Sequence, residues 1–156
     1  MKTVAVSIAV IKGPHGCLYF QLRAKDPYKG FLGLVGGKVE KGETNEACLR
    51  REVYEESKLT LEKVEYLGTV TEELKKGDEL IAVSLHTFVA TTDQEAVGNK
   101  EEGKMVCVLE KDLLENKEKF IPTDWIITEK VLNNESCTFK INVTESKGKY
   151  EITNIE

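Results

Sequence analysis

Apolar and polar residues alternate along much of the chain, and glycine-bearing or charged turns interrupt this alternation repeatedly. A period of two residues is typical of β-strands that bury one face. The predicted strands are residues 3–11, 17–23, 31–35, 64–74, 80–91, 104–109, 138–143 and 149–155. Glycine-containing turns at residues 13–16, 75–78 and 147–148 are short enough to join the flanking strands as hairpins.

A helix is predicted over residues 44–57. The hydroxyl of Thr44 can accept a hydrogen bond from the exposed N–H groups of a first helical turn, which makes it a suitable cap. Leu49 and Val53 are four residues apart and can anchor the helix on an apolar core.

A second long helix is predicted over residues 123–132, just after Pro122, and a shorter one over residues 110–116. Trp125 falls in register with the apolar side of the second helix, so we expect it in the core rather than as a stacking platform. Strands before, between and after the helices predict an α/β fold, with a mixed β-sheet between helices on both faces. The chain length of 156 residues favours a single domain over residues 1–156.

Composition narrows the range of partners. The formal net charge of -5 argues against electrostatic binding of a DNA or RNA polymer. No segment approaches the ~20 consecutive apolar residues of a membrane span, so no membrane partner is expected. A small anionic substrate remains compatible with this charge if a bound metal ion supplies positive charge.

The four cysteines give no sign of a metal knuckle or a disulfide framework. Cys17, Cys48, Cys107 and Cys137 are widely spaced, and none belongs to a CxxC pair. We therefore expect reduced thiols and a cytoplasmic location.

An acidic pattern lies within the first predicted helix. At about 100° per residue, Glu52, Glu55 and Glu56 fall within an arc of roughly 100° and share one face. Three ionised carboxylates repel one another unless solvent or a divalent cation compensates them. One interpretation is a solvated, salt-bridged face, and the other is a site for Mg²⁺ or Mn²⁺, which prefer oxygen ligands.

Other residues in register with these glutamates favour the metal site. Arg51 can reach Glu55 along the helix and Glu43 from just before it, which suggests an orienting role. Gly36 and Gly37 allow a close backbone approach that a side chain would block, and a carbonyl there could join a metal shell.

The spacing of these residues resembles the signature of the Nudix hydrolase family. That signature is Gly, five residues, Glu, seven residues, Arg-Glu-apolar, one residue, Glu-Glu, one residue and Gly-apolar. Here it begins at Gly37 and ends at Leu59, with Lys58 in place of the last glycine. Val35 also replaces a proline that is common before the paired glycines.

The resemblance implies the family's α/β/α sandwich and its roles for individual residues. Glu52 and Glu56 would be principal metal ligands, Glu55 a further ligand, and Gly36 or Gly37 would add a carbonyl. The catalytic base would come either from the signature helix or from a later loop, which contains Glu101 and Glu102.

The same resemblance implies a reaction and a substrate class. Water would attack the phosphate chain of a small-molecule nucleotide and release a nucleoside monophosphate and pyrophosphate. Arg23 is a candidate phosphate contact, although an ion pair is its alternative role, and Lys38 belongs with the paired glycines among the substrate-binding residues. The enzyme would act as a monomer or a homodimer.

Beyond the signature, the chain resembles the branch that hydrolyses oxidised purine nucleoside triphosphates such as 8-oxo-dGTP. Asp124 matches an acidic base-reading position of that branch, although an acidic residue in a first helical turn also has an ordinary electrostatic role. Thr123, Ile121 and Gly33 depart from the branch at three other base-contacting positions. The alternatives are a Nudix hydrolase of ADP-ribose, a dinucleotide polyphosphate or another nucleoside diphosphate conjugate, and a nucleotide-binding domain without turnover.

Overall fold

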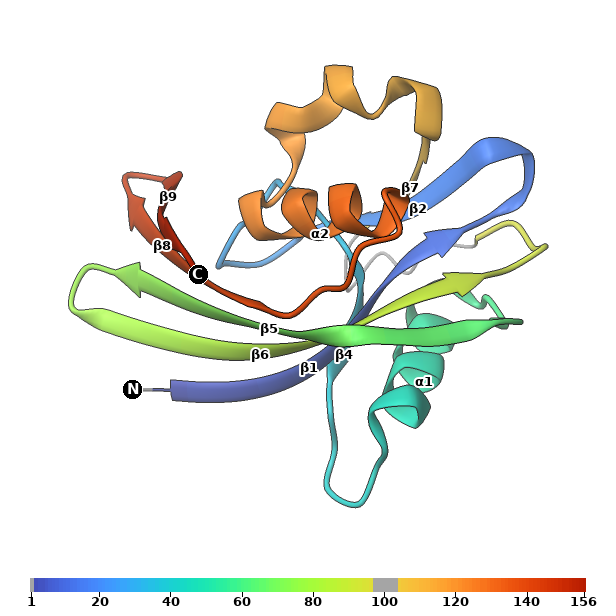
Figure 1. The fold of residues 1–156 in the computed structure, drawn as a ribbon, viewed down its shortest axis with the longest axis horizontal. Helices are drawn as coiled ribbons and strands as arrows, with labels where there is room; N and C mark the ends of the chain where they lie inside the picture. Colours follow the sequence, from blue (N-terminus) through green and yellow to red (C-terminus); the bar gives the residue numbers. More distant parts are fainter. Residues whose placement is uncertain (1, 97–103) are drawn as a thin grey trace.

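The strands form a curled mixed β-sheet, with helix α1 on one face and helix α2 on the other (Figure 1). This computed structural model describes residues 2–96 and 104–156. The strands are β1 (Lys2–Lys12), β2 (Cys17–Leu22), β3 (Leu32–Gly33), β4 (Val35–Lys38), β5 (Val64–Lys76), β6 (Glu79–Thr91), β7 (Lys104–Leu109), β8 (Phe139–Ser146) and β9 (Lys149–Ile155). The helices are α1 (Asn45–Ser57) and α2 (Pro122–Leu132), with short 3₁₀ segments η1 (Pro14–Gly16), η2 (Glu110–Asp112) and η3 (Leu114–Lys119). The predicted α/β fold with helices on both faces is confirmed.

The central strands combine parallel and antiparallel pairing. The strand order is β3-β2-β1-β6-β5-β8-β9, while β4 pairs with β1 and β7 pairs with β2. β1 is parallel to β6, and β5 is parallel to β8. Because β1 lies inside the sheet between two helical layers, Ser7 to Ile11 are buried on both faces, which explains their largely apolar run.

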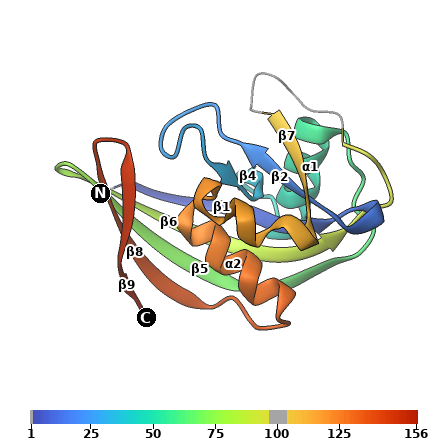
Figure 2. The ribbon, with the colours of Figure 1, turned by 90° about the horizontal axis from the view of Figure 1, so that it is seen from above.

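The β8–β9 hairpin closes one end of the sheet on the side of α2, and α2 crosses the middle of the sheet when it is viewed from above (Figure 2). Within the described ranges, neither α1 nor α2 has the length and apolar character needed to traverse a lipid bilayer.

Each face of the sheet has its own apolar core. Leu49 and Val53 on α1 are fully buried with Val35, so these two residues seat the helix as the sequence predicts. On the other face, Trp125 is 7% exposed and packs edge-on against Phe120. Trp125 is therefore a core residue, as expected.

The ends of α1 follow the local sequence signals. The Ala47 N–H donates to the Thr44 hydroxyl oxygen at 3.0 Å, so Thr44 caps the helix as predicted. Lys58 ends the helix in the left-handed conformation, with φ of 62°. A side chain with a Cβ is disfavoured in this conformation, where helices usually place glycine.

Two predicted elements differ from the structure. Residues 31–35 were expected as one strand, but β3 ends at Gly33 and β4 continues through both glycines to Lys38. The reason is that β3 pairs with β2 while β4 pairs with β1, so the segment changes its neighbour at Leu34. The segment predicted as a helix at residues 110–116 instead forms the short 3₁₀ turns η2 and η3.

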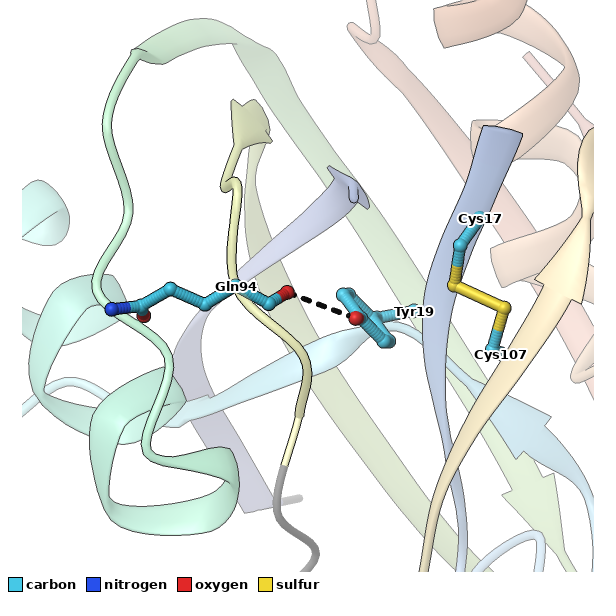
Figure 3. Close-up of a disulfide and its surroundings, with 4 residues drawn as sticks. All are labelled: Cys17, Tyr19, Gln94 and Cys107. Atoms are coloured by element: carbon cyan, nitrogen blue, oxygen red, sulfur yellow. Dashed lines mark hydrogen bonds between the residues drawn. A yellow bond between two sulfur atoms is a disulfide. The ribbon is translucent and has the colours of Figure 1, made fainter. Parts of the chain in front are cut away.

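The expectation of four reduced thiols is wrong for two cysteines. Cys17 on β2 and Cys107 on β7 are joined by a disulfide, with their Cα atoms 5.6 Å apart (Figure 3). Only the pairing of β2 with β7 brings them together, because 90 positions separate them in the sequence. Cys48 and Cys137 are free and buried. Because two of the four cysteines form a disulfide, the cysteines no longer support the expected cytoplasmic location.

The first prediction concerns the left-handed residue at the end of α1. The Lys58 ammonium also lies 5.2 Å from the centre of the Tyr54 ring, so Lys58→Ala is the appropriate reference because it removes this contact and keeps a Cβ. We expect Lys58→Gly to be about 1 kcal/mol more stable than Lys58→Ala in urea unfolding, since glycine relieves the backbone penalty. Equal stability of the two variants would contradict this account of the helix end.

The second prediction concerns the disulfide. Alkylation of the unfolded, unreduced protein should modify two cysteines, Cys48 and Cys137, and alkylation after reduction should modify four, as counted by mass spectrometry. Cys17→Ser should leave Cys107 as a third reactive thiol. Modification of four cysteines before reduction would restore the original expectation of reduced thiols.

Candidate active site

Two of the predicted glutamates line a cavity between α1 and the sheet, which we call the helix cavity. Its volume is about 620 Å³. Glu56 is 5% exposed, and Glu52 has a side chain that is 16% exposed. The cavity lining includes Glu52, Glu56, Gly36, Gly37, Lys38, Arg23 and Gln21. The structure therefore brings together most of the residues that the sequence singled out.

The paired glycines are required by close packing. A Cβ atom at Gly36 would overlap the carbonyl oxygen of Ser7 on β1, and a Cβ atom at Gly37 would overlap the carboxylate of Glu52. The Glu52 side chain thus lies directly against the backbone of β4. This is the close approach that the sequence analysis attributed to the glycine pair.

Arg51, in the middle of α1, connects the helix to the loop before it. Its Nε and Nη2 atoms donate to the two carboxylate oxygens of Glu43, at 2.6 and 2.9 Å, and its Nη2 atom also donates to the Lys38 carbonyl oxygen at 3.2 Å. Its Nη1 atom donates to Glu52 at 2.8 Å. Hydrogen bonds from Arg51, together with one from the Glu40 backbone N–H, lower the pKa of Glu43 to about 2. The predicted orienting role of Arg51 therefore has a geometric basis.

Glu55 has a different environment from Glu52 and Glu56. Its side chain is 51% exposed, lies 3.4 Å from Arg51, and is not part of the helix-cavity lining. Within residues 2–96 and 104–156, no three His, Cys, Asp or Glu side chains converge closely enough to form a ready-made metal site. The predicted base candidates Glu101 and Glu102 lie outside the described residues.

A second cavity, which we call the inner cavity, adjoins the first. It has a volume of about 480 Å³, and Gln21, Arg23, Gly36, Gly37 and Lys38 line both cavities. The Arg23 Nε atom donates to the Pro27 carbonyl oxygen at 2.9 Å, and the Arg23 charge opposes the rise in the pKa of Glu72 and of Asp124. Its roles as a phosphate contact and as an ion-pair partner both stay predictions.

Asp124 lies on the inner cavity, in the first turn of α2. The side chain is buried, and its Oδ2 atom accepts a hydrogen bond from the Leu34 N–H at 2.8 Å. A Cβ atom at Gly33 would approach this oxygen to 3.1 Å. Burial, with a smaller contribution from the nearby Glu72, raises the pKa of Asp124 to about 7, whereas the Leu34 hydrogen bond and the Arg23 charge oppose this rise.

Sequence analysis missed two inner-cavity residues, Glu72 and Gln21. Glu72 is 6% exposed on β5, and Gln21 is 7% exposed on β2. Glu72 occupies a position where strand alternation predicts an apolar residue, between the buried Val70 and Leu74. Gln21 lies in β2, where residues 17–21 are all buried. A polar side chain at such a buried position was the sequence signal that could have identified each residue.

A further cavity of about 370 Å³ beside the disulfide contains Cys17, Tyr19, Met105 and Cys107 but none of the predicted site residues. Beside this cavity, the Tyr19 hydroxyl donates to the Gln94 carbonyl oxygen at 3.0 Å (Figure 3). Most of the predicted site residues therefore lie at the helix cavity and the inner cavity.

Comparison with known proteins agrees with this geometry. A sequence profile of the NUDIX domain matches residues 1–131. The chain therefore belongs to the Nudix family, and it is a hydrolase that acts on diphosphate linkages.

Solved structures share the fold at low sequence identity. A mutator MutT protein from Bacillus halodurans is 20% identical, with a TM-score of 0.74 over 98% of this chain and 96% of its own. The NUDIX domain of Shewanella oneidensis NrtR, solved in complex with ADP ribose, is 16% identical, with a TM-score of 0.71 over 86% of this chain and 89% of its own. A MutT NUDIX hydrolase from Burkholderia pseudomallei is 22% identical, with a TM-score of 0.66 over 84% and 99%.

The burial of Asp124 predicts a pH effect on stability. The folded protein retains a proton on Asp124 up to a pKa of about 7, whereas the ordinary value is 3.8. The folded state therefore binds more protons than the unfolded state between these values, and raising the pH through this window lowers the free energy of unfolding. Asp124→Asn lacks this contribution.

Urea unfolding at several pH values checks this expectation. From pH 4 to pH 7.5 the stability of Asp124→Asn should improve relative to wild type by on the order of 2 kcal/mol. The Glu72 carboxyl, whose pKa burial also raises, is coupled to Asp124, so the difference between the two pH profiles reports on the pair. Parallel pH profiles for the two proteins would show that Asp124 titrates normally.

Proposed function

We propose that this protein is a Mg²⁺-dependent hydrolase that cleaves a nucleoside triphosphate to a nucleoside monophosphate and pyrophosphate. Modified purine nucleotides such as 8-oxo-dGTP are among the substrates we expect. The observation that carries this proposal is the position of Glu52 and Glu56 beside the Gly36–Gly37 backbone, in a cavity that adjoins a second cavity containing Asp124.

The donor atoms fit a hard divalent cation. Glu52, Glu56 and the carbonyl of Gly36 would hold Mg²⁺, or Mn²⁺ in its place, and Glu55 and Glu102 are the further candidate ligands. Two carboxylates are sufficient because Mg²⁺ usually combines one or two protein carboxylates with water and substrate phosphates. When bound, the ion would neutralise the phosphate oxygens and activate a water molecule.

The chain's own residues would then bind and orient the substrate. Arg51 holds Glu52 through its hydrogen bond and is itself held by Glu43, so the carboxylate is positioned before substrate arrives. Lys38 and Arg23 line both cavities, where they would contact the phosphate chain. Asp124 would face the base, and Glu102 or a glutamate of α1 would accept the proton from water.

A second candidate function is hydrolysis of ADP-ribose or another nucleoside diphosphate conjugate. The fold similarity to the NUDIX domain of Shewanella NrtR in complex with ADP ribose favours including it. Steady-state rates on a panel of triphosphates, ADP-ribose and dinucleotide polyphosphates, with Mg²⁺ or Mn²⁺, separate the two. A kcat/KM for ADP-ribose well above that for every triphosphate would reject the leading proposal.

Glu56→Gln tests the proposed role of the signature helix. We expect Mg²⁺-dependent turnover to fall by about 10³-fold or more, because the variant loses a proposed ligand to the ion that activates the water. Circular dichroism should show an intact fold. Glu46→Gln is the matched control, because Glu46 is on the same helix but pairs with Arg50 at 3.1 Å and is half-exposed.

Near-normal turnover in Glu56→Gln would exclude the proposed metal site. Absence of phosphate or pyrophosphate release by the wild type on the whole panel would favour the third interpretation, a nucleotide-binding domain without turnover.

A further inference from the structure

The Glu72 carboxylate is held by one of its two oxygens. The Tyr28 hydroxyl donates to Oε1 at 3.0 Å, and the Thr123 hydroxyl donates to the same oxygen. Among the described residues, no hydrogen-bond donor is directed to Oε2. The side chain is therefore fixed in orientation while half of its acceptor capacity remains available.

Glu72 and Asp124 both line the inner cavity. The walls around them are largely apolar and include Val6, Ile8, Ile81, Val83, Leu85 and Ile121. A buried acceptor in apolar surroundings is unfavourable unless a donor reaches it. Two such acceptors in one cavity favour a ligand that carries more than one N–H or O–H donor.

Gln21 adds an independent observation. It is 7% exposed and lines both cavities, and its Nε2 atom has no hydrogen-bond partner within residues 2–96 and 104–156. Buried amide donors are normally paired, so this one is suited to an acceptor on a bound molecule. The inner cavity thus offers two carboxylate acceptors and one amide donor.

We propose that Glu72 is a specificity-determining residue that, together with Asp124, recognises a base with two adjacent N–H donors, while Gln21 donates to a carbonyl on the same base. This proposal rests on the proposed function, because it assumes that a nucleotide places its base in the inner cavity.

Among the common bases, guanine alone carries a ring N–H beside an exocyclic amino group and next to a carbonyl. Adenine and cytosine present an amino group beside an unprotonated ring nitrogen, and uracil and thymine present one N–H between two carbonyls. The apolar walls suit either face of such a ring. The cavity chemistry therefore selects a guanine-type base, whether or not the ring is oxidised elsewhere.

Binding of nucleoside monophosphates, measured by isothermal titration calorimetry, tests the proposal without requiring hydrolysis. Wild-type protein should bind GMP about tenfold or more tightly than AMP, since adenine lacks the adjacent donors and would leave the carboxyl oxygens of the cavity unpaired. Glu72→Gln keeps an oxygen for Tyr28 and Thr123 but turns an amide donor toward the cavity. It should weaken GMP binding by about tenfold and change AMP binding by less than about threefold.

Glu73→Gln is the matched control. Glu73 follows Glu72 on β5, points to the opposite face of the sheet, and pairs with Lys140 at 3.3 Å and with Asn142. Both affinities should remain at wild-type values in this variant. If Glu72→Gln does not fold, Asp124→Asn replaces it and should show the same selective loss of GMP binding.

Equal binding of GMP and AMP by the wild type, or an equal loss of both in Glu72→Gln, would overturn the proposal and leave Glu72 a structural residue. A triphosphate assay on the same preparations separates this failure from that of the proposed function. Lack of hydrolysis with a GMP preference that depends on Glu72 would reject the proposed reaction and retain the proposed recognition.

Discussion

The candidate active site depends on one close contact, that of the Glu52 carboxylate with the backbone of Gly37. The contact is possible because position 37 has no side chain and because Leu49 and Val53 bury α1 firmly against the sheet. Arg51 then fixes the carboxylate from its solvent side. The position of Glu52 is therefore set by the packing of α1 and by the ion pair with Arg51, and a side chain at position 37 would push the Glu52 carboxylate out of this place.

The carboxylates beside Arg51 and those of the inner cavity lie in opposite electrostatic environments. Around Arg51 the acidic groups are near solvent, and a neighbouring guanidinium holds the pKa of Glu43 well below its usual range. In the inner cavity burial dominates and raises the pKa of both Glu72 and Asp124. The region thus combines the strongly ionised Glu43, which anchors Arg51, with the weakly ionised Glu72 and Asp124, which are suited to hydrogen bonding with a neutral ring.

Sequence patterns predicted the features that depend on local interactions. The capping hydroxyl of Thr44 involves residues within one helical turn, and hairpins depend on short turns. The disulfide of Cys17 with Cys107 and the burial of Glu72 depend instead on which strands become neighbours. Pairing across 90 positions leaves no spacing rule in the chain, so only the folded sheet could reveal it.

The parallel alignment of β1 with β6 has a consequence for biosynthesis. Lys2 pairs with Ile81, and Lys12 pairs with Thr91, so β1 leaves a ribosome about eighty positions before the strand with which it pairs. Until then, β1 exposes an unpaired edge, and α1 lacks part of the surface on which it packs. Such long-range pairing slows folding and prolongs exposure of aggregation-prone strands. Completion of the central sheet, rather than formation of α1, would then determine when a newly synthesised chain can bind its substrate.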